Sequence, residues 1–295
     1  MELNAANRAM LTQGYSAAFQ KGLAHRPPMW QSAAMLVPSS TSDNVYDWLK
    51  DTFSIREWLG DRQKQNLTTA DYVVKNRKFE GTIEVDRDKV ADNQYGTYSK
   101  TFEQMGERVN TFPDSLVFGL MKAGFANTCW DGQFFFDIDH PVGLQGREVS
   151  VSNFMGGAGE GWYIMDSKKL MKPFIYQERE AFKMVSKDRD QDDNVFERNK
   201  LVYGVDGRAN AAYGLWQLCF ASKQTLDVAN VKAALTAMGA QRDDSGEPLQ
   251  IDADTIFVSP NLREAARDLF SKELIANETN TLKNRLNVVS SGYLL

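Results

Sequence analysis

The chain has very few cysteines and histidines, and these shortages limit the chemistry that it can carry. Among 295 residues, only Cys129 and Cys219 are cysteines, and only His25 and His140 are histidines. Two cysteines so far apart argue against a disulfide framework and a thiolate zinc site, and they are typical of a reducing compartment. The chain also lacks a basic-then-apolar leader and any apolar run of ~20 residues, so we predict a protein without membrane contact, made in the cytosol.

The chain also lacks a strong excess of charge of one sign. Its 34 basic and 39 acidic residues give a net charge of -5. A surface that grips duplex nucleic acid usually shows as a basic domain, and none is visible. The composition does fit a protein that encloses nucleic acid without binding it tightly. Hydrophobic residues at 42% and charged residues at 25% are typical of a folded protein of roughly one to three domains.

Motifs of catalysis and nucleotide binding are missing as well. No GxSxG is present, and the glycines of 156–161 neither complete GxGxxG nor precede a Walker lysine. The acidic run 188–193 begins with the spacing of a calcium loop. Asp193 and Asn199, however, stand where that loop needs Gly and Glu, so we expect an exposed acidic turn.

One cluster resembles a metal site. Asp137, Asp139 and His140, with Asp131 nearby, offer carboxylate and imidazole ligands suited to Mg, Mn or Zn. The same residues equally suit a turn in which carboxylates accept backbone hydrogen bonds, and we favour the turn. Cys129 with His140 is a conceivable nucleophilic pair. We therefore predict no catalytic residue, no cofactor and no metal site, and keep a metal-dependent hydrolase as an alternative.

The N-terminal segment predicts a helix on a tether. Residues 2–24 place apolar side chains on one helical face, and Pro27 and Pro28 end the helix. A mixed connector follows to about Phe53. Such a helix either folds back on its own subunit or docks on a neighbour, and both alternatives remain open.

The next segment predicts an extended hairpin. Apolar and polar residues alternate over 79–86, which indicates a strand with one buried face, and Tyr72–Val74 favours a strand upstream of it. We expect the connection within Asn66–Lys78. A lone charged hairpin is at best marginally stable in water, and the unpaired backbone groups at its edges need a partner strand or another covering segment. Assembly with other copies of the chain is therefore the first hypothesis.

The hairpin and the N-terminal helix supply the contacts that we expect between subunits. Basic residues gather toward the hairpin tip, where they either meet acids of an adjacent subunit or are simply solvated. Ile83→Asp should leave a folded subunit that assembles poorly. The candidates are Leu11, Tyr15, Phe19, Arg62, Lys64, Tyr72, Lys75, Arg77, Lys78, Phe79 and Ile83.

Downstream, the pattern predicts one long helix, then a region of short β segments, and then a region in which helices and strands alternate. An apolar stripe runs from Phe102 to Leu120 straight through Pro113, which favours one bent helix over 98–125; a second helix beginning at Pro113 is the alternative. Short β segments follow, and the last third has an α/β rhythm. We expect a hairpin at 131–141, a strand at 211–220, a helix at 225–240 capped by Thr225, a buried strand at 255–259, a helix at 261–274 opened by Ser259 and Pro260, and a final strand.

Several runs of the sequence resemble the Mu-like phage major head subunits. They are RKFEGTIEVDRDKV and its continuation to Phe125, CWDGQFFFDIDHPVG, KPFIYQERE, NKLVYGVDGRANAAYGLWQLCFASK and LNVVSSGYLL. The likeness keeps the order of segments over nearly the whole chain. It implies an α+β chain with the HK97-type capsid fold: an N-terminal arm at 1–55, an extended hairpin loop (E-loop) and its base at 56–97, a peripheral domain at 98–221 with a spine helix at 98–125, an axial domain at 222–285 and a C-terminal strand at 286–295.

The resemblance also implies a function. It points to a major capsid protein that self-assembles as hexamers and pentamers into the icosahedral head of a tailed phage enclosing double-stranded DNA. The implied partners are other copies of the chain, a separate scaffold protein, a portal, and packaged DNA contacted non-specifically. Assembly would occur in the bacterial host cytoplasm and the product would be the virion capsid. An encapsulin-like compartment is the other alternative.

Overall fold

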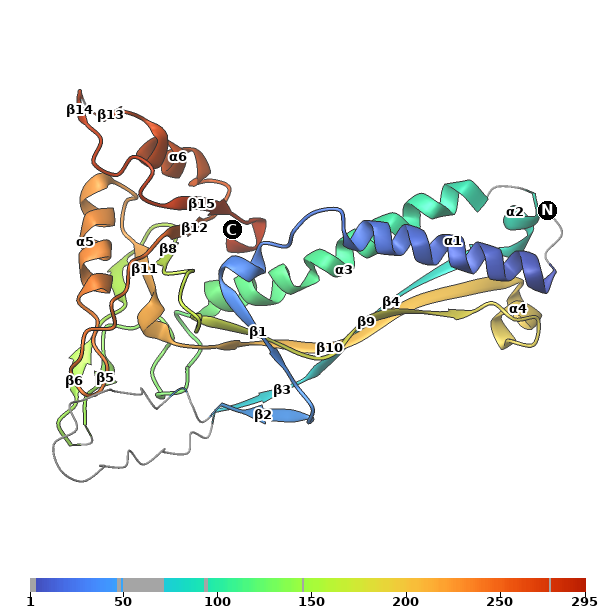
Figure 1. Ribbon diagram of the computed structural model, residues 1–295, viewed down its shortest axis with the longest axis horizontal. Coiled ribbons are helices and arrows are strands. Elements are labelled where there is room, and N and C mark those ends of the chain that lie inside the picture. The colour runs from blue at the N-terminus through green and yellow to red at the C-terminus, as the bar shows by residue number, and fades with distance from the viewer. Residues whose placement is uncertain (1–3, 47–48, 50–71, 93–94, 145, 276) are drawn as a thin grey trace.

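The computed structural model describes residues 4–46, 49, 72–92, 95–144, 146–275 and 277–295. It has a long arm at one end and a lobe at the other (Figure 1). Within the described residues, no helix has both the length and the apolar content that a membrane crossing requires.

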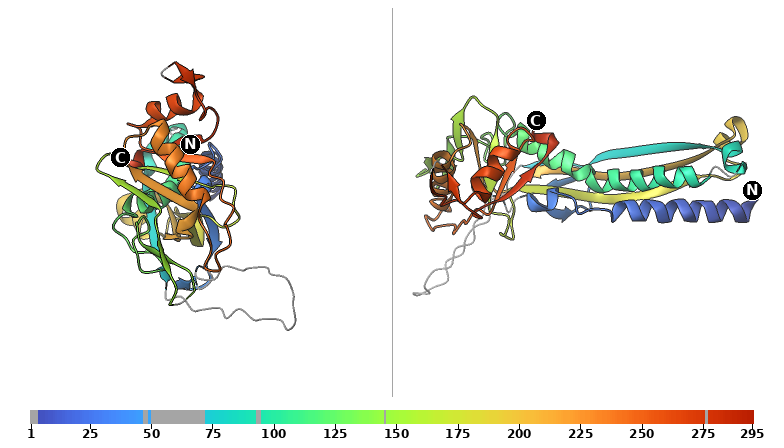
Figure 2. Two further views of the ribbon diagram at one scale, coloured as in Figure 1. Left: turned by 90° about the vertical axis from the view of Figure 1, so that its left-hand side faces the viewer. Right: turned by 90° about the horizontal axis from the view of Figure 1, so that it is seen from above.

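The arm is built on a four-stranded sheet. β1 runs parallel to β9, whereas β9 with β10 and β10 with β4 are antiparallel. β4 therefore lies at one edge of the sheet, which Figure 2 shows from above. The strands, in spatial order, are β1 (Ala34–Pro38), β9 (Phe174–Lys187), β10 (Lys200–Tyr213) and β4 (Arg77–Asp86).

Two helices cover one face of this sheet. α3 (Tyr95–Ala123) continues through Pro113, so the prediction of a single helix is confirmed and the alternative of a second helix is wrong. α1 (Ala5–Leu23) begins where the Asn4 side chain accepts the N–H of Asn7 at 2.9 Å. The arm helices and strands share an apolar cluster that includes Tyr15, Phe102, Val85, Leu201 and Tyr203.

The strand pairing expected for the hairpin is wrong. β4 does not pair with the segment just before it; Arg77–Asp86 pairs with Lys200–Ala209 of β10. β3 (Val73–Lys75) pairs instead with β2 (Asp43–Val45). The alternation over 79–86 correctly gave one buried face, but a period of two says nothing about which strand lies alongside. The predicted connection at Asn66–Lys78 lies partly outside the described residues.

The lobe contains a five-stranded sheet between two apolar layers. α5 (Val228–Gly239) and α6 (Arg263–Ser271) cover one face, where they pack with Ile164 and Phe220. The other face meets the end of α3, where Phe118 and Met121 pack with Phe257. The strands, in spatial order, are β15 (Asn287–Ser290), β12 (Thr255–Val258), β8 (Trp162–Met165), β11 (Cys219–Lys223) and β7 (Phe154–Gly157).

Several local predictions in this half need correction. The strand expected at 211–220 is broken, because the 3₁₀ turn Trp216–Leu218 separates β10 from β11. The stretch 131–141 is a set of turns, and its last residues begin β5, which pairs with β6. Asp227, rather than Thr225, caps α5, because its carboxylate accepts the N–H of Asn230 at 2.8 Å.

The remaining elements are short. They are a 3₁₀ turn at Trp30–Ser32, α2 (Arg87–Ala91), β5 (His140–Val142), β6 (Val149–Val151), α4 (Asp193–Arg198), β13 (Leu274–Ile275), β14 (Glu278–Thr279) and a 3₁₀ turn at Gly292–Leu294.

Candidate functional site

The N-terminal contact candidates lie inside the subunit. Leu11, Tyr15 and Phe19 have exposed fractions of 8%, 1% and 1%, and the Tyr15 ring stacks on Phe102 of α3 at 4.3 Å. Of the two alternatives for this helix, the structure shows the folded-back one. The three side chains reach a neighbour only if α1 leaves α3, so their role between subunits stays a prediction.

The acidic run before α4 holds the start of α1. Thr12 donates a hydrogen bond to Asp188 at 2.6 Å. One carboxylate oxygen of Asp190 lies 2.8 Å from Arg8 of α1 and 3.2 Å from Arg87 of α2. The run is therefore an acidic turn, as expected, but it also clamps the arm helix. Sequence reasoning missed this role, because nothing in the local pattern pairs residues so far apart.

The hairpin candidates divide into covered apolar residues and exposed basic ones. Phe79 meets Phe112 of α3 at 4.6 Å between ring centroids, and Ile83 packs against the arm's apolar cluster. Tyr72 is also partly covered, and its hydroxyl accepts the N–H of Tyr213 at 3.0 Å. Arg62 and Lys64 lie outside the described residues; Lys75, Arg77 and Lys78 are exposed.

An open groove of about 420 Å³ lies between α3 and the edge strand β4. Phe79 and Ile83 line it from the strand, and Met105, Val109 and Phe112 line it from the helix. An edge strand beside an apolar groove is a typical place for a second chain to add, because it offers backbone hydrogen-bonding groups and pockets together.

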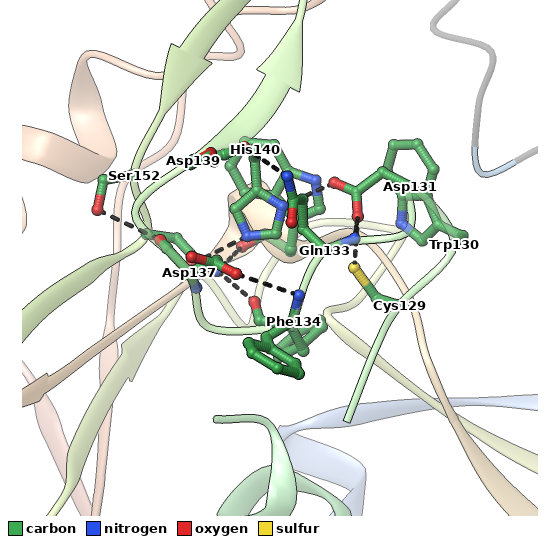
Figure 3. A network of polar contacts seen from close by, with 12 residues as sticks. Cys129, Trp130, Asp131, Gln133, Phe134, Asp137, Asp139, His140 and Ser152 are labelled. Atoms are coloured by element: carbon green, nitrogen blue, oxygen red, sulfur yellow. Dashed lines mark hydrogen bonds and ion pairs between the residues drawn. The ribbon is translucent and has the colours of Figure 1, made fainter. Parts of the chain in front are cut away.

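A buried polar network lies where the lobe meets the arm (Figure 3). The Nδ1 atom of His140 is 2.7 Å from a carboxylate oxygen of Asp131, and its Nε2 is 3.2 Å from the amide oxygen of Asn153. The thiol of Cys129 donates to the other oxygen of Asp131 at 3.0 Å. The His140 ring stacks on Trp216, with centroids 3.9 Å apart and planes at 10°.

The electrostatics of this network do not favour a nucleophile. Burial raises the pKa of the Cys129 thiol well above its ordinary value, and the neighbouring Asp131 carboxylate raises it further. A thiol that stays protonated is a poor nucleophile. Burial also acts to raise the pKa of Asp131, but hydrogen bonds from His140 and Cys129 outweigh it and lower that pKa.

The predicted carboxylate cluster does not come together as a ligand set. Asp137 accepts the backbone N–H groups of Phe134 and Ile138, which is the turn role that we favoured. Within the described residues, the set of potential metal ligands within 4.8 Å of one another is Cys129, Asp131 and His140, and neither Asp137 nor Asp139 belongs to it.

Comparisons of sequence show which proteins this chain is similar to. The family described as Mu-like prophage major head subunit gpT matches residues 9–294. The Mu-like prophage FluMu major head subunit of Haemophilus influenzae is 36% identical over 294 residues, covering 95% of this chain and 96% of that protein. The major capsid protein of Escherichia phage Mu is 36% identical over 287 residues, covering 94% of each.

Comparisons of structure extend the likeness to the fold. A chain from the procapsid of bacteriophage JBD30 superposes with a TM-score of 0.89 at 34% identity, covering 99% of this chain and 100% of that chain. A chain from the JBD30 capsid superposes with a TM-score of 0.79 at 26% identity, covering 94% of each.

Proposed function

Since this chain belongs to the family of Mu-like prophage gpT major head subunits, we propose that its copies assemble as hexamers and pentamers into the icosahedral head of a tailed phage around double-stranded DNA. The chain is a major capsid protein with the HK97-type fold, a structural component of the virion capsid and not an enzyme. The observation that carries the proposal is the likeness to the JBD30 procapsid chain over 99% of this chain. The matches give no support to an encapsulin-like compartment or a metal-dependent hydrolase.

We propose an N-terminal arm at 1–42, a peripheral domain with α3 as its spine helix, and an axial domain built on the five-stranded sheet. That sheet takes β7 and β8 from before residue 222 and also includes β15, and β11 (Cys219–Lys223) crosses the boundary expected at 221/222. The axial domain that we propose is therefore larger than the 222–285 expected from the sequence. The pairing of β2 with β3 supports a base of the extended loop at Asp43–Val45 and Val73–Lys75, earlier than the 56–97 expected from the sequence. β4 then belongs with the peripheral sheet, because it pairs with β10.

Contacts between copies would draw on two kinds of surface. The groove between α3 and β4 offers apolar area, and apolar contact contributes about 25 cal/mol per Å² removed from water. The exposed basic residues of β3 and β4 offer charge, but an exposed ion pair contributes only ~0–1 kcal/mol. Repeated apolar contacts would therefore supply most of the stability of the shell, and the charges would set orientation.

The remaining partners follow from the same role. We propose that a separate scaffold protein guides closure, that a portal occupies one vertex, and that packaged DNA is contacted without sequence preference. A net charge of -5 suits a wall that encloses DNA but does not bind it tightly. Assembly would take place in the cytoplasm of the bacterial host.

The experiment is negative-stain electron microscopy of the purified protein, with and without its scaffold, beside size-exclusion light scattering. Closed shells, or rings of five and six, are the expected result. A monodisperse monomer under every condition, with the scaffold present, would contradict the proposal.

A further inference from the structure

We propose that the edge strand β4 docks on the β4 strand of a second copy of this chain, with the two strands antiparallel around a two-fold axis at Gly81. The inference rests on the proposed function and deepens it, because it names one of the contacts that join copies in the shell. In such a contact each copy offers the same residues to the other, so the surface must be complementary to itself.

The edge that β4 offers is long and open. β4 spans Arg77–Asp86, and within the described part of the chain it has a neighbouring strand on one side only. Seen from above, it runs along the outer side of α3 (Figure 2). An edge strand presents a row of backbone N–H and C=O groups to which a further strand can pair. A second chain can therefore approach this side of the sheet.

The two faces of β4 differ in chemistry. Phe79 and Ile83 are half-buried and line the groove beside α3, and Gly81 lies between them. Successive side chains of a strand point to opposite faces, so the other face carries Lys78, Glu80, Thr82 and Glu84, all exposed. The edge thus has an apolar row on the groove face and a charged row on the opposite face, and a docked strand has to match both.

The charges select one register. A two-fold axis normal to the sheet passes through one residue of each strand, and the longest overlaps place it at Gly81 or at Thr82, the centre of the strand. With the axis at Thr82, Glu80 would face Glu84 twice, and like charges directly opposite are destabilising. With the axis at Gly81, Lys78 faces Glu84 twice and no two like charges meet.

The apolar row agrees with the same register. With the axis at Gly81, Phe79 of each copy faces Ile83 of the other, because both lie two residues from the axis. An aromatic residue opposite a β-branched one is a favourable cross-strand pair. The groove of one copy then continues into the groove of the other, and apolar residues that are half-buried in one subunit are covered between two.

Lys78 has no favourable neighbour across the sheet within its own copy. Its position on β10 is opposite Arg208, which carries the same charge, and Glu84 is opposite Val202. Glu84 of a second copy would give Lys78 an opposite charge on its free side. This complementarity is why we name a second copy as the occupant of the edge.

An exchange of charges tests the contact. Lys78 and Glu84 lie ~20 Å apart along β4, at about 3.3 Å per residue, so they do not meet within one copy. Lys78→Glu and Glu84→Lys each place like charges across the axis, and each should lose most of its shells in light scattering and electron microscopy. The double variant exchanges the two charges and should recover the shells. Urea unfolding of each unassembled variant checks the subunit.

Gly81→Cys tests the register without a change of charge. A Cβ at Gly81 would meet a methyl of Val205 at 3.6 Å, which is an ordinary contact, so the subunit should fold. Opposite Cα atoms of paired strands lie ~4.5–5.5 Å apart, within the reach of a disulfide. Oxidised shells of Gly81→Cys should therefore give covalent dimers on a denaturing gel without reductant. The native Cys129 and Cys219 are buried, and wild-type shells give their background.

Glu80→Cys and Thr82→Cys are the matched controls. In the proposed register, each of these thiols lies ~7 Å along the strand from its own copy, so neither variant alone should form dimers. Shells mixed from the two variants should form them, because position 80 faces position 82. Dimers from either control alone would overturn the register.

Two further outcomes separate this inference from the proposed function. Gly81→Cys shells without dimers, or a double charge variant that folds but assembles as poorly as the single variants, would overturn the inference and leave the proposed function intact. A wild-type protein that forms neither shells nor rings would contradict the proposed function, and this inference with it.

Discussion

Gly22 of α1 and Gly106 of α3 let the two helices touch backbone to backbone. A Cβ on Gly22 would lie 1.9 Å from the backbone oxygen of Glu103, and a Cβ on Gly106 would lie 2.1 Å from that of Phe19. Neither contact is with a flexible side chain that could move away. The folded-back position of the arm helix therefore depends on two residues without a side chain.

Gly106→Ala should destabilise the subunit by about 1–3 kcal/mol, because an added methyl forces the helices apart. Gly119 lies in the same helix, and a Cβ there would meet nothing within 4 Å. Gly119→Ala is thus the matched control, and it should stabilise by about 0.5–1 kcal/mol through its helix propensity. Urea unfolding of unassembled subunits would measure both. Equal effects of the same sign would contradict the close approach.

Asp114 of α3, which binds the turn at Trp30–Ser32, should make the stability of the subunit depend on pH. Its side chain is buried and accepts the N–H of Trp30 at 2.7 Å. Burial raises the pKa of Asp114 above its ordinary value, although the N–H groups of Trp30 and Met29 act in the opposite direction. The folded state therefore holds the proton more tightly than the unfolded state. The contribution to stability is largest below about pH 4 and falls as the pH rises through the raised pKa.

The variants Asp114→Asn and Asp114→Ala separate charge from hydrogen bonding. Asparagine stays neutral and still offers an oxygen to Trp30, so wild type should lose stability relative to Asp114→Asn as pH rises from 4 to 7. Alanine leaves the N–H of Trp30 without this acceptor and should cost about 1–3 kcal/mol at both pH values. Unfolding followed by tryptophan fluorescence would measure this. A wild type that gains on the asparagine variant with rising pH would disprove the assignment.

Glu103 should give the helix pair an opposite dependence on pH. Its hydrogen bonds with Lys100 and Lys21 hold its pKa at about 2. A carboxyl whose pKa is lowered in the folded state contributes its full share of stability above its ordinary pKa. That contribution is lost as the pH falls toward 2. Lys21 joins α1 to α3 at 2.9 Å, whereas Lys100 lies on α3 itself. Lys21→Gln should therefore release α1 to thermolysin faster at pH 7, and more so at low salt, than Lys100→Gln. Equal rates would rule out a role in helix pairing.

The sequence predicted the elements that a local pattern of apolar residues defines. The apolar stripe of α3 passes through Pro113 in the pattern and in the structure, and α1 and α5 follow from the same periodicity. Contacts between residues far apart in the chain could not be predicted from the sequence. The alternation at Phe79 and Ile83 gave a buried face, but nothing local showed that α3 covers it. His140 and Asp131 were noticed as possible ligands, yet Asn153 and Trp216, which contact His140, come from segments that only the fold brings together.

The structure changes what Ile83→Asp would test. Ile83 is half-buried against the arm's apolar cluster and also lines the open groove, so a carboxylate there should lower the stability of the subunit as well as change the groove. Poor assembly of that variant would then say little about contacts between copies. An informative variant has to change an exposed residue and leave the subunit intact.

Lys78→Glu meets that requirement. Lys78 is exposed and lies directly opposite Arg208 on the neighbouring strand, so a glutamate there replaces a like-charge pair with an opposite one. The free energy of unfolding should stay within about 0.5 kcal/mol of wild type or rise slightly. If Lys78 meets acids of an adjacent copy, the yield of shells should fall, while Lys78→Arg assembles normally. Light scattering and electron microscopy would read the yield beside urea unfolding. Normal shells from Lys78→Glu would remove this residue from the interface, whereas lost shells with an unchanged subunit would place it there.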